Sequence, residues 1–513
     1  MRSSFAVALF VFASSLQAQS PFDPALDAVM QEKVYAGSVW GLLVVDAESG
    51  RDVVAKNGDK LFNPASVTKL FTCAAFLATF GLEHRFATNA YLRTVKAVDG
   101  SDRVYLVVRA AGDPNLSGRL DAKGRALWTN SDHIYSGGGN GAELPECDPL
   151  SGLADIARQV AAAGVKAVDE VVFDERLFVR AQGSGSGPGV VTPVVVNDNG
   201  VDLLVSPAAE AGKPATFELR PRTEQVAVDV QVTTTETGKE GAIRIERLGP
   251  NRYAARGTIE CGRRPVVKLL AVDDPAAFAR GLLVACLREA GVKTSASTLA
   301  ANDATLLPEI GEYAALPVVA RHLSPPLEDL LQVVLKVSHN LHASTLPLVL
   351  GAARGARTLE EAMPIEAEVL RSLGVDTTAI SFGGGAGGST ADMVTPRATV
   401  ALLEAMRRRP DFDAYKRALP ILGVDGTLAK AVERDSPARG KVFAKTGTMS
   451  YDNLLDGSTL LRSKALAGYL TAKSGREFVF ALFVNNATMH DGMDSTKAGR
   501  ALGKICEVLH EHL

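Results

Sequence analysis

With 513 residues, of which 46% are hydrophobic and 22% charged, the chain has the composition of an ordinary globular protein. This length accommodates about two to four domains, each with its own core. The formal net charge of −3 leaves no basic footprint, which argues against a nucleic-acid-binding protein. We expect a small or peptidic ligand instead.

The first residues predict a secretory signal peptide. Arg2 supplies a minimal positive charge, residues 5–12 are apolar, and Ala18 offers a small residue for cleavage. The apolar stretch is too short to span a bilayer, and no later segment approaches about 18 uninterrupted apolar residues. An ordinary buried first helix is the alternative. We expect residues 1–18 to be removed and the mature protein to be exported, to the periplasm or otherwise.

A hairpin and a buried helix are predicted next. Residues 38–46 are apolar and β-prone, a turn follows, and residues 52–55 return. Asn63, as N-cap, then opens a helix that continues to Phe80 and stops at Gly81. Ser66 would lie in the first turn of this helix.

Residues 86–309 are predicted to be an inserted mixed domain, because related motifs flank them on both sides. Two glycine-rich loops are expected there, at 129–145 and 183–189. Short alternating segments predict a small β subdomain near 213–272. A helix at 275–290 follows.

The remaining residues, 310–513, are expected to complete the first domain, 19–85. A helix ends at Lys336, residues 338–340 form a tight connection, and a second helix ends at Gly351. Further elements are a helix at 398–406, strands at 441–448, 464–470 and 477–484, and a last helix at 495–510. With the opening hairpin these strands predict an α+β fold, a mostly antiparallel sheet flanked by helices.

The five cysteines lie far apart and form no CxxC or Cys/His cluster, so a structural zinc site is not expected. Cys73 falls in an apolar pattern that predicts a core residue. Export would permit disulfides, but an odd count leaves at least one thiol unpaired or intermolecular. The connectivity of Cys73, Cys147, Cys261, Cys286 and Cys506 stays open.

Three short motifs carry the chemistry. They are Ser66-Val67-Thr68-Lys69, Ser338-His339-Asn340 and Lys445-Thr446-Gly447. Each alone is common and has an ordinary explanation, such as a solvated lysine or a turn. Together, in this order and on a helix, a helix connection and a strand, they match a set found in acyl-serine enzymes that work without a catalytic histidine. His339 and His342 are therefore expected to be structural or exposed.

A serine hydroxyl needs an adjacent proton acceptor to act as a nucleophile. Lys69 shares a helical face with Ser66, and burial or a second cation such as Lys445 would lower its pKa. Ser338 could relay a proton to the leaving nitrogen, while Asn340 would orient the substrate amide and Lys69.

The oxyanion and the substrate carboxylate need donors of their own. The backbone N–H groups of Ser66 and Thr448 are candidates for the oxyanion. The hydroxyls of Thr446 and Thr448, beside Gly447, can contact a terminal carboxylate, which Lys445 would attract.

On these motifs the chain resembles the D-alanyl-D-alanine carboxypeptidase/endopeptidase family of large-insert, low-molecular-mass class C penicillin-binding proteins. The long interval between Ser66 and Ser338 is part of the match. Further matches are Gly112-Asp113-Pro114, Val196-Asn197-Asp198-Asn199 with Ser206-Pro207, Ser324-Pro325-Pro326, Lys336, Gly423-Val424-Asp425-Gly426-Thr427-Leu428 and Thr448.

The resemblance implies hydrolysis of the terminal D-Ala-D-Ala bond, or of D-alanyl cross-links, in peptidoglycan stem peptides. It also implies acylation of Ser66 by β-lactam antibiotics. No metal or organic cofactor is expected, no nucleic acid and no transmembrane segment, while a loose membrane association stays open.

Three departures from the family pattern stand out. Relatives tend to carry Asp-Gly-Ser-Gly-Leu-Ser where this chain has the glycine-rich residues 383–389, and they often have glutamate at the position of Ser344. Residues 452–462 form an unusual stretch after the third motif. A slowed turnover or an altered acyl-donor pocket would follow from such changes.

Asp113 is a further candidate substrate-binding residue, for a cationic amine of the stem peptide if the insert overhangs the cleft. The alternative is a turn aspartate before Pro114. Two rival functions also remain: a β-lactamase-like hydrolase and a catalytically silent wall-binding protein.

Overall fold

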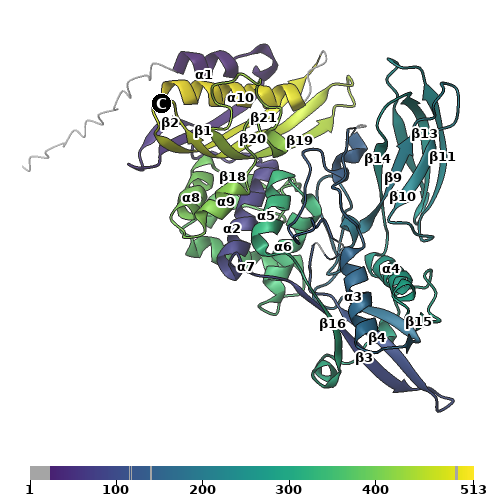
Figure 1. Cartoon of the computed structure of the whole chain (residues 1–513). Coiled ribbons are helices and arrows are strands. Elements are labelled where there is room, and N and C mark those ends of the chain that lie inside the picture. Colours follow the sequence, from purple (N-terminus) through teal and green to yellow (C-terminus); the bar gives the residue numbers. More distant parts are fainter. Residues whose placement is uncertain (1–22, 115, 117, 139–140, 491–494) are drawn as a thin grey trace, which may run out of the picture.

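The computed structural model describes residues 23–114, 116, 118–138, 141–490 and 495–513 (Figure 1). The predicted signal peptide, residues 1–18, lies outside them. In the described part of the chain no helix is both long and apolar enough to cross a membrane. All five cysteines are described, and none is in a disulfide.

One antiparallel sheet organises the first domain. Its strand order is β19-β20-β21-β1-β2, with β1 (Val39–Asp46), β2 (Asp52–Lys56), β19 (Val442–Asp452), β20 (Thr459–Thr471) and β21 (Glu477–Met489). The pairing of β1 with β21 joins the two ends of the chain in one sheet, as predicted. The stretch 452–462 is the end of the β19–β20 hairpin.

Helices cover both faces of this sheet (Figure 1). On one face α1 (Asp23–Met30) and α10 (Ser495–His512) contribute to an apolar cluster with the sheet. The other face carries α8 (Pro396–Arg407) and a helical group of α2 (Thr68–Phe80), α5 (Leu327–Lys336), α6 (Asn340–Ala352), α7 (Leu359–Ser372) and α9 (Phe412–Arg417). Residues 68–77 of α2 are all buried, and most of them are apolar, as is typical of a helix inside a core.

Two local predictions need correction. Gly351 does not end the second helix: α6 continues to Ala352, and a Cβ at Gly351 would lie 2.6 Å from Ala362 Cβ. The glycine therefore serves the close approach of α6 and α7. Ser66 lies in a separate 3-10 turn, η2 (Ala65–Val67), ahead of α2, and the Asn63 side chain accepts only from the Ala65 N–H.

The insert is built on a second sheet, β16-β3-β4-β6. Its strands are β3 (Ala87–Lys96), β4 (Asp102–Arg109), β6 (Glu170–Asp174) and β16 (Val318–Leu323), and α3 (Ser151–Ala162) and α4 (Pro275–Glu289) pack beside it. Antiparallel pairing of β3 with β16 brings the two ends of the insert together, so its last strand follows the boundary at residue 309 that the sequence predicts. The Ser324 N–H donates to Phe86 O at 3.0 Å, so the chain enters and leaves side by side.

A β-rich lobe completes the insert, in teal at the right of Figure 1. One sheet contains β9 (Gly200–Ser206), β10 (Thr216–Arg220) and β14 (Val266–Ala271), and another contains β11 (Ala227–Thr235), β12 (Ile243–Gly249) and β13 (Arg252–Glu260). Short strands of the insert are β5 (Ala167–Val168), β7 (Ala181–Gln182), β8 (Val190–Val191) and β15 (Lys293–Thr294). Two more, β17 (Ile380–Ser381) and β18 (Met393–Val394), pair with each other in the first domain. The predicted α+β class with a β-rich insert is confirmed.

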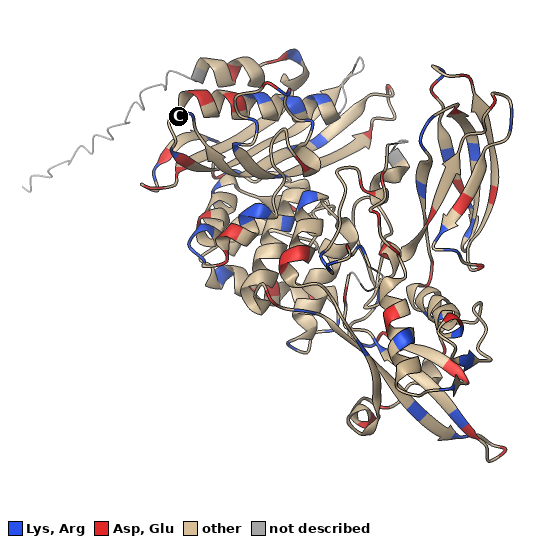
Figure 2. Cartoon of the chain, in the orientation of Figure 1, with Lys and Arg blue, Asp and Glu red and all other residues tan. Residues whose placement is uncertain are grey.

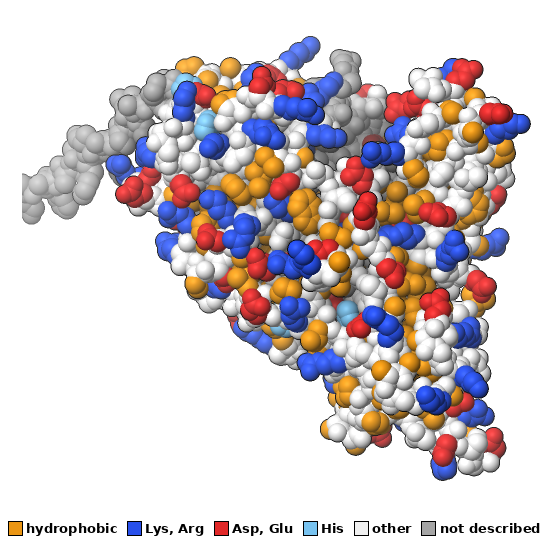
Figure 3. Space-filling view, viewed as in Figure 1, with side chains coloured by type: hydrophobic (Ala, Val, Ile, Leu, Met, Phe, Trp, Pro, Cys, Tyr) orange, Lys and Arg blue, Asp and Glu red, His pale blue; other side chains and the backbone are white. Residues whose placement is uncertain are grey.

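Charged residues are spread over both parts of the molecule (Figure 2). On the face drawn in Figure 3, acidic and basic side chains are interspersed and neither sign forms a continuous patch. This distribution agrees with the small net charge and offers no polyanion-binding face on that side.

Candidate active site

Lys69 is the centre of the first motif. Its Nζ lies 2.9 Å from Ser66 Oγ, 2.8 Å from Asn340 Oδ1 and 2.6 Å from Ala386 O. The side chain is fully buried, whereas Ser66 at the start of the same helical segment is partly exposed. One amine therefore joins the candidate nucleophile to the second motif.

Burial lowers the pKa of Lys69 to about 7, although the nearby Cys73 thiol and Asp392 carboxylate oppose the shift. An amine with this pKa is substantially neutral near neutral pH. It can accept the proton of the Ser66 hydroxyl, which an ordinary lysine could not do.

The second motif occupies the tight connection between α5 and α6, as predicted. Ser338 has a left-handed φ of 67°, and Asn340 is the first residue of α6. Asn340 Nδ2 donates to Ser186 O at 3.0 Å, so this amide contacts Lys69 on one side and the insert on the other. The buried His339 does not line the cleft described below.

The third motif lies on β19. Lys445 is fully buried, and its Nζ donates to Thr446 O at 2.9 Å. Burial lowers its pKa well below the usual value, and the neighbouring amines Lys69 and Lys464 lower it further. The two lysines of the predicted site are thus close enough to repel each other electrostatically.

Lys464 is a cleft residue that sequence reasoning missed. It lies on β20 directly opposite Thr448, and its Nζ donates to Thr448 Oγ1 at 2.9 Å. The signal that could have found it is the register of the β19–β20 hairpin, because pairing the two strands places Lys464 opposite Thr448.

A cleft of about 700 Å³ brings members of all three motifs together. It is lined by Ser66, Tyr135, Gly185, Ser186, Ser338, Asn340, residues 386–388, Thr427, Thr446, residues 448–451 and Lys464. Ser66, Ser338 and Asn340 therefore meet in one crevice, with Lys69 directly behind Ser66.

The unusual glycine-rich segment 383–389 forms part of this cleft and fits its surroundings closely. A Cβ at Gly387 would lie 1.9 Å from Ala65 O, and the Gly388 N–H donates to Ser184 Oγ at 3.1 Å. Asp392 anchors both ends of the segment by accepting from the N–H groups of Gly383 and Ser389. Glycines here let the backbone approach Ser66 and the insert.

The second glycine-rich segment, 183–189, crosses from the insert to the cleft. A Cβ at Gly185 would lie 2.6 Å from Asn340 Nδ2, and one at Gly183 would lie 3.2 Å from Ser344 Oγ. The small Ser344 side chain, noted above as a departure, therefore lies where this segment passes. The two glycine-rich segments contact each other next to Asn340.

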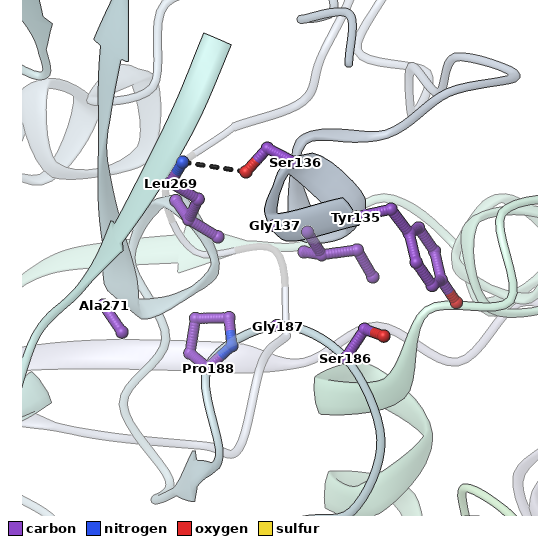
Figure 4. A pocket seen from close by; sticks show the side chains of 9 residues that line it. Tyr135, Ser136, Gly137, Ser186, Gly187, Pro188, Leu269 and Ala271 are labelled. Atoms are coloured by element: carbon purple, nitrogen blue, oxygen red, sulfur yellow. Dashed lines mark hydrogen bonds between the residues drawn. The ribbon is translucent and has the colours of Figure 1, made fainter. Parts of the chain in front are cut away.

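A second cavity of about 350 Å³ adjoins the cleft on the side of the insert (Figure 4). It shares Tyr135 and Ser186 with the cleft and extends to Leu269 and Ala271 on β14. The Leu269 N–H donates to Ser136 Oγ at 2.9 Å, which fixes one wall. The insert therefore supplies extra room next to the cleft.

Asp113 is not among the residues that line the cleft. It is 1% exposed, and its Oδ2 lies 3.9 Å from His322 Nε2 within the insert. This surrounding favours the alternative of a structural aspartate before Pro114.

A serine hydroxyl beside a buried lysine, at the start of a helix that packs under an antiparallel sheet, defines an acyl-serine hydrolase of the transpeptidase-like class. Comparison with protein families agrees with this class. The model of the D-Ala-D-Ala carboxypeptidase 3 (S13) family matches residues 23–505, and the chain belongs to that family. It is accordingly a serine-type peptidase.

Curated relatives cover most of the chain. A D-alanyl-D-alanine carboxypeptidase of Actinomadura sp. (strain R39) is 30% identical over 91% of this chain and 81% of that protein. The carboxypeptidase DacB of Haemophilus influenzae is 24% identical over 91% of this chain and 90% of that protein.

The fold is shared with a solved structure. Penicillin binding protein 4 (dacB) of Haemophilus influenzae aligns with a TM-score of 0.67 at 20% identity, over 94% of this chain and 97% of that one. This match shows the transpeptidase-like fold together with its insert.

Proposed function

We propose that this protein is an exported peptidase that cleaves the terminal D-Ala-D-Ala bond of peptidoglycan stem peptides through an acyl-Ser66 ester. The observation that carries the proposal is the 2.9 Å contact between Ser66 Oγ and the buried Nζ of Lys69. Membership of the S13 family gives the substrate class.

In the acylation step, neutral Lys69 accepts the proton of the Ser66 hydroxyl and Oγ attacks the carbonyl carbon of the penultimate D-Ala. The backbone N–H groups of Ser66 and Thr448 hold the oxyanion that forms. As the C–N bond breaks, Ser338 relays to the departing D-Ala nitrogen the proton that Lys69 took from Ser66, which leaves both Lys69 and Ser338 neutral again. Water then hydrolyses the ester, with Lys69 again as the base, and releases Ser66.

The third motif recognises the substrate carboxylate. The hydroxyls of Thr446 and Thr448 face the cleft beside Gly447, and the Lys464 amine, which donates to Thr448 Oγ1, attracts an anion there. Lys445 contributes little positive potential, because burial lowers its pKa. Charge-assisted hydrogen bonds of this kind are about twice as strong as neutral ones. A free C-terminal carboxylate is therefore favoured as the leaving end.

Cleavage of D-alanyl cross-links is a second candidate activity. The cavity beside Tyr135 and Ser186 gives a longer, branched substrate room on the side of the insert. β-Lactams would acylate Ser66, since they present a carbonyl and a carboxylate to the same groups. The stem peptides lie outside the cytoplasm, which requires an exported protein; a loose attachment to the membrane would serve the same location.

Intact-mass spectrometry after brief exposure to labelled penicillin tests the proposal. We expect one long-lived adduct and release of D-alanine from a D-Ala-D-Ala peptide, and we expect Ser66→Ala to lose both. Ser474→Ala, at an exposed turn serine, is the matched control and should keep both. Labelling or D-alanine release that persists in Ser66→Ala refutes the nucleophile.

The lifetime of the adduct separates the rival functions. Rapid loss of the penicillin adduct, with turnover of the antibiotic, would indicate a β-lactamase-like hydrolase. Muropeptide binding without any D-alanine release would indicate a silent wall-binding protein.

A further inference from the structure

A buried network of ionisable side chains joins the insert to the segment that carries the second motif. The insert contributes Arg119, Asp132, His133, Asp198 and Asp202, and the first domain contributes His339 and His342. Every member is at most 7% exposed, and none lines the cleft. We call this set the junction network.

Asp198 is its centre. Oδ2 accepts from Arg119 Nε at 3.0 Å and from His133 Nε2 at 2.7 Å, while Oδ1 lies 2.7 Å from His342 Nε2 and 3.2 Å from His339 Nε2. A single carboxylate from the insert therefore contacts two histidines of the first domain. The backbone that presents it is unusual, since residues 197–199 all have left-handed φ angles of 45–57°.

Pairing keeps this network charged despite burial. Arg119 also forms a fork on Asp132, with contacts of 2.6 and 3.0 Å. Burial lowers the pKa of His133, but the carboxylates of Asp202 and Asp132 outweigh it and raise that pKa to about 10. Both ring nitrogens of His133 thus donate to carboxylates, at 2.6 Å to Asp202 and 2.7 Å to Asp198.

His339 takes part as a neutral ring. Burial and the neighbouring His342 lower its pKa to about 3. Its Nδ1 accepts the backbone N–H of His342 at 3.4 Å, so in the neutral ring the proton is on Nε2, which lies 3.2 Å from Asp198 Oδ1 and 3.5 Å from Arg119 Nη2. The rings of His339 and His342 stack with their centroids 3.7 Å apart, which fixes the plane of the first ring.

The junction network contacts the second motif at two points. His339 stands between Ser338 and Asn340, which line the cleft, while its own side chain is held by Asp198. In the same turn as His133, η3 (His133–Gly138), the Tyr135 hydroxyl donates to Ser338 O at 2.6 Å. Figure 4 shows that hydroxyl directed at the ribbon next to α6.

We propose that the junction network sets the positions of Ser338 and Asn340, and that Asp198 is a positioning residue for acylation of Ser66. The inference rests on the proposed function. Ser338 has a left-handed backbone that few non-glycine residues adopt, so something must hold it. Asn340 in turn sets the orientation of Lys69 through the 2.8 Å contact to Nζ.

The ligand atoms of Asp198, His339 and His342 lie within 4.8 Å of one another, a spacing that could also hold a metal ion. Arg119 donates to the same Asp198 carboxylate and would repel a second cation there. The cation that neutralises Asp198 is therefore the Arg119 guanidinium rather than a metal ion. Added zinc tests this assignment below.

The test compares Asp198→Asn with the wild type in β-lactam acylation, measured per acylatable site. A displacement of about 1 Å in a catalytic group can cost on the order of 10²-fold in rate. We expect the acylation rate constant of Asp198→Asn to fall by about that factor, with the reversible binding constant of the β-lactam nearly unchanged. An unchanged rate constant overturns the inference.

Asp174→Asn is the matched control. Asp174 is 2% exposed and accepts from Arg176 at 2.8 Å and from Tyr313 at 2.6 Å, within the insert and without contact to the second motif. Both variants should lose thermal stability, but only Asp198→Asn should lose acylation rate. Equal losses of rate in both would mean that general destabilisation is the cause, which overturns the inference.

His339 provides the rescue experiment. His339→Leu removes the donor to Asp198, whereas His339→Gln keeps one, so the glutamine variant should recover most of the lost rate. A glutamine variant as slow as the leucine variant contradicts positioning through this bond. So does a zinc ion that raises the melting temperature of the wild type and speeds acylation, because the site would then be a metal site.

The failure of this inference is distinguishable from that of the proposed function. A wild type that is never acylated refutes the acyl-Ser66 mechanism. A wild type that is acylated, beside an Asp198→Asn variant of equal rate, refutes only the role of the network.

Discussion

Two groups of buried charges lie on either side of the Ser338-His339-Asn340 segment, and burial acts on them in opposite ways. Next to the cleft, Lys69 and Lys445 form no ion pair with a carboxylate of the described residues, and burial lowers both pKa values. In the junction network, Arg119 and Asp198 are paired, and each keeps its charge. The comparison shows that pairing, rather than depth, decides whether a buried group is charged.

The largest expected effect is on the cleft side. Lys69→Met keeps the length of the side chain but removes the base, and general-base catalysis typically contributes about 10²–10⁴-fold. We expect acylation by penicillin to slow by that factor, as followed by intact mass. Lys430→Met, at another lysine of the same domain, is the control and should react normally. A Lys69→Met variant that is acylated at the wild-type rate would contradict the comparison, because the neutral amine would then not be the base.

On the network side, loss of the central cation should lower the free energy of unfolding. Arg119→Met leaves Asp132 and Asp198 without their main cation, and breaking a buried ion pair costs about 3–5 kcal/mol. Chemical denaturation measures this change. Arg176→Met is the control: its side chain is 31% exposed, so the loss should be clearly smaller. Equal losses would show that solvent reaches both pairs alike.

The pH dependence sharpens the contrast. Lys69 must be neutral to accept a proton, so acylation should be constant above pH 7 and fall tenfold per unit below the pKa of about 7. Burial also raises the pKa of Glu366 to about 7, which makes Glu366→Gln a necessary control. If the acylation rate of Glu366→Gln no longer falls below pH 7, the glutamate and not the lysine controls the pH dependence.

The smallest expected effect is at the exposed rim. Lys464→Met removes one cation beside Thr448, and a hydrogen bond to a charged group contributes about 1.5–3 kcal/mol at most. We expect about a tenfold rise in KM for a D-Ala-D-Ala peptide and no change for the corresponding amide. An equal rise in KM for both substrates would show that Lys464 does not recognise the substrate carboxylate.

Much of the candidate site could be predicted because its information is local. Ser66 and Lys69 are three residues apart, which places them on one face of a helix whatever surrounds it. Thr446 and Thr448 alternate on a strand and so face the same side. The apolar patterns of β1, β21 and α2 likewise predicted the central sheet and its buried helix.

The remainder depends on contacts between distant residues. Asp198 meets His339 and His342 only when the insert docks, and no spacing in the chain indicates that meeting. The sequence predicts a helix stop at Gly351, whereas the reason for a glycine there, the close approach of α7, comes from tertiary packing. The roles of segments 183–189 and 383–389 were hidden for the same reason.

The neighbouring positions of Phe86 and Ser324 have a consequence for how such a protein could be assembled. Where two ends are one hydrogen bond apart, a parent fold can accept a whole extra domain at a single turn without losing a strand. Excision and religation at that turn would leave a continuous chain. The same cut would remove Asp198 and Tyr135, so the smaller protein would keep its nucleophile but lose the support of its second serine.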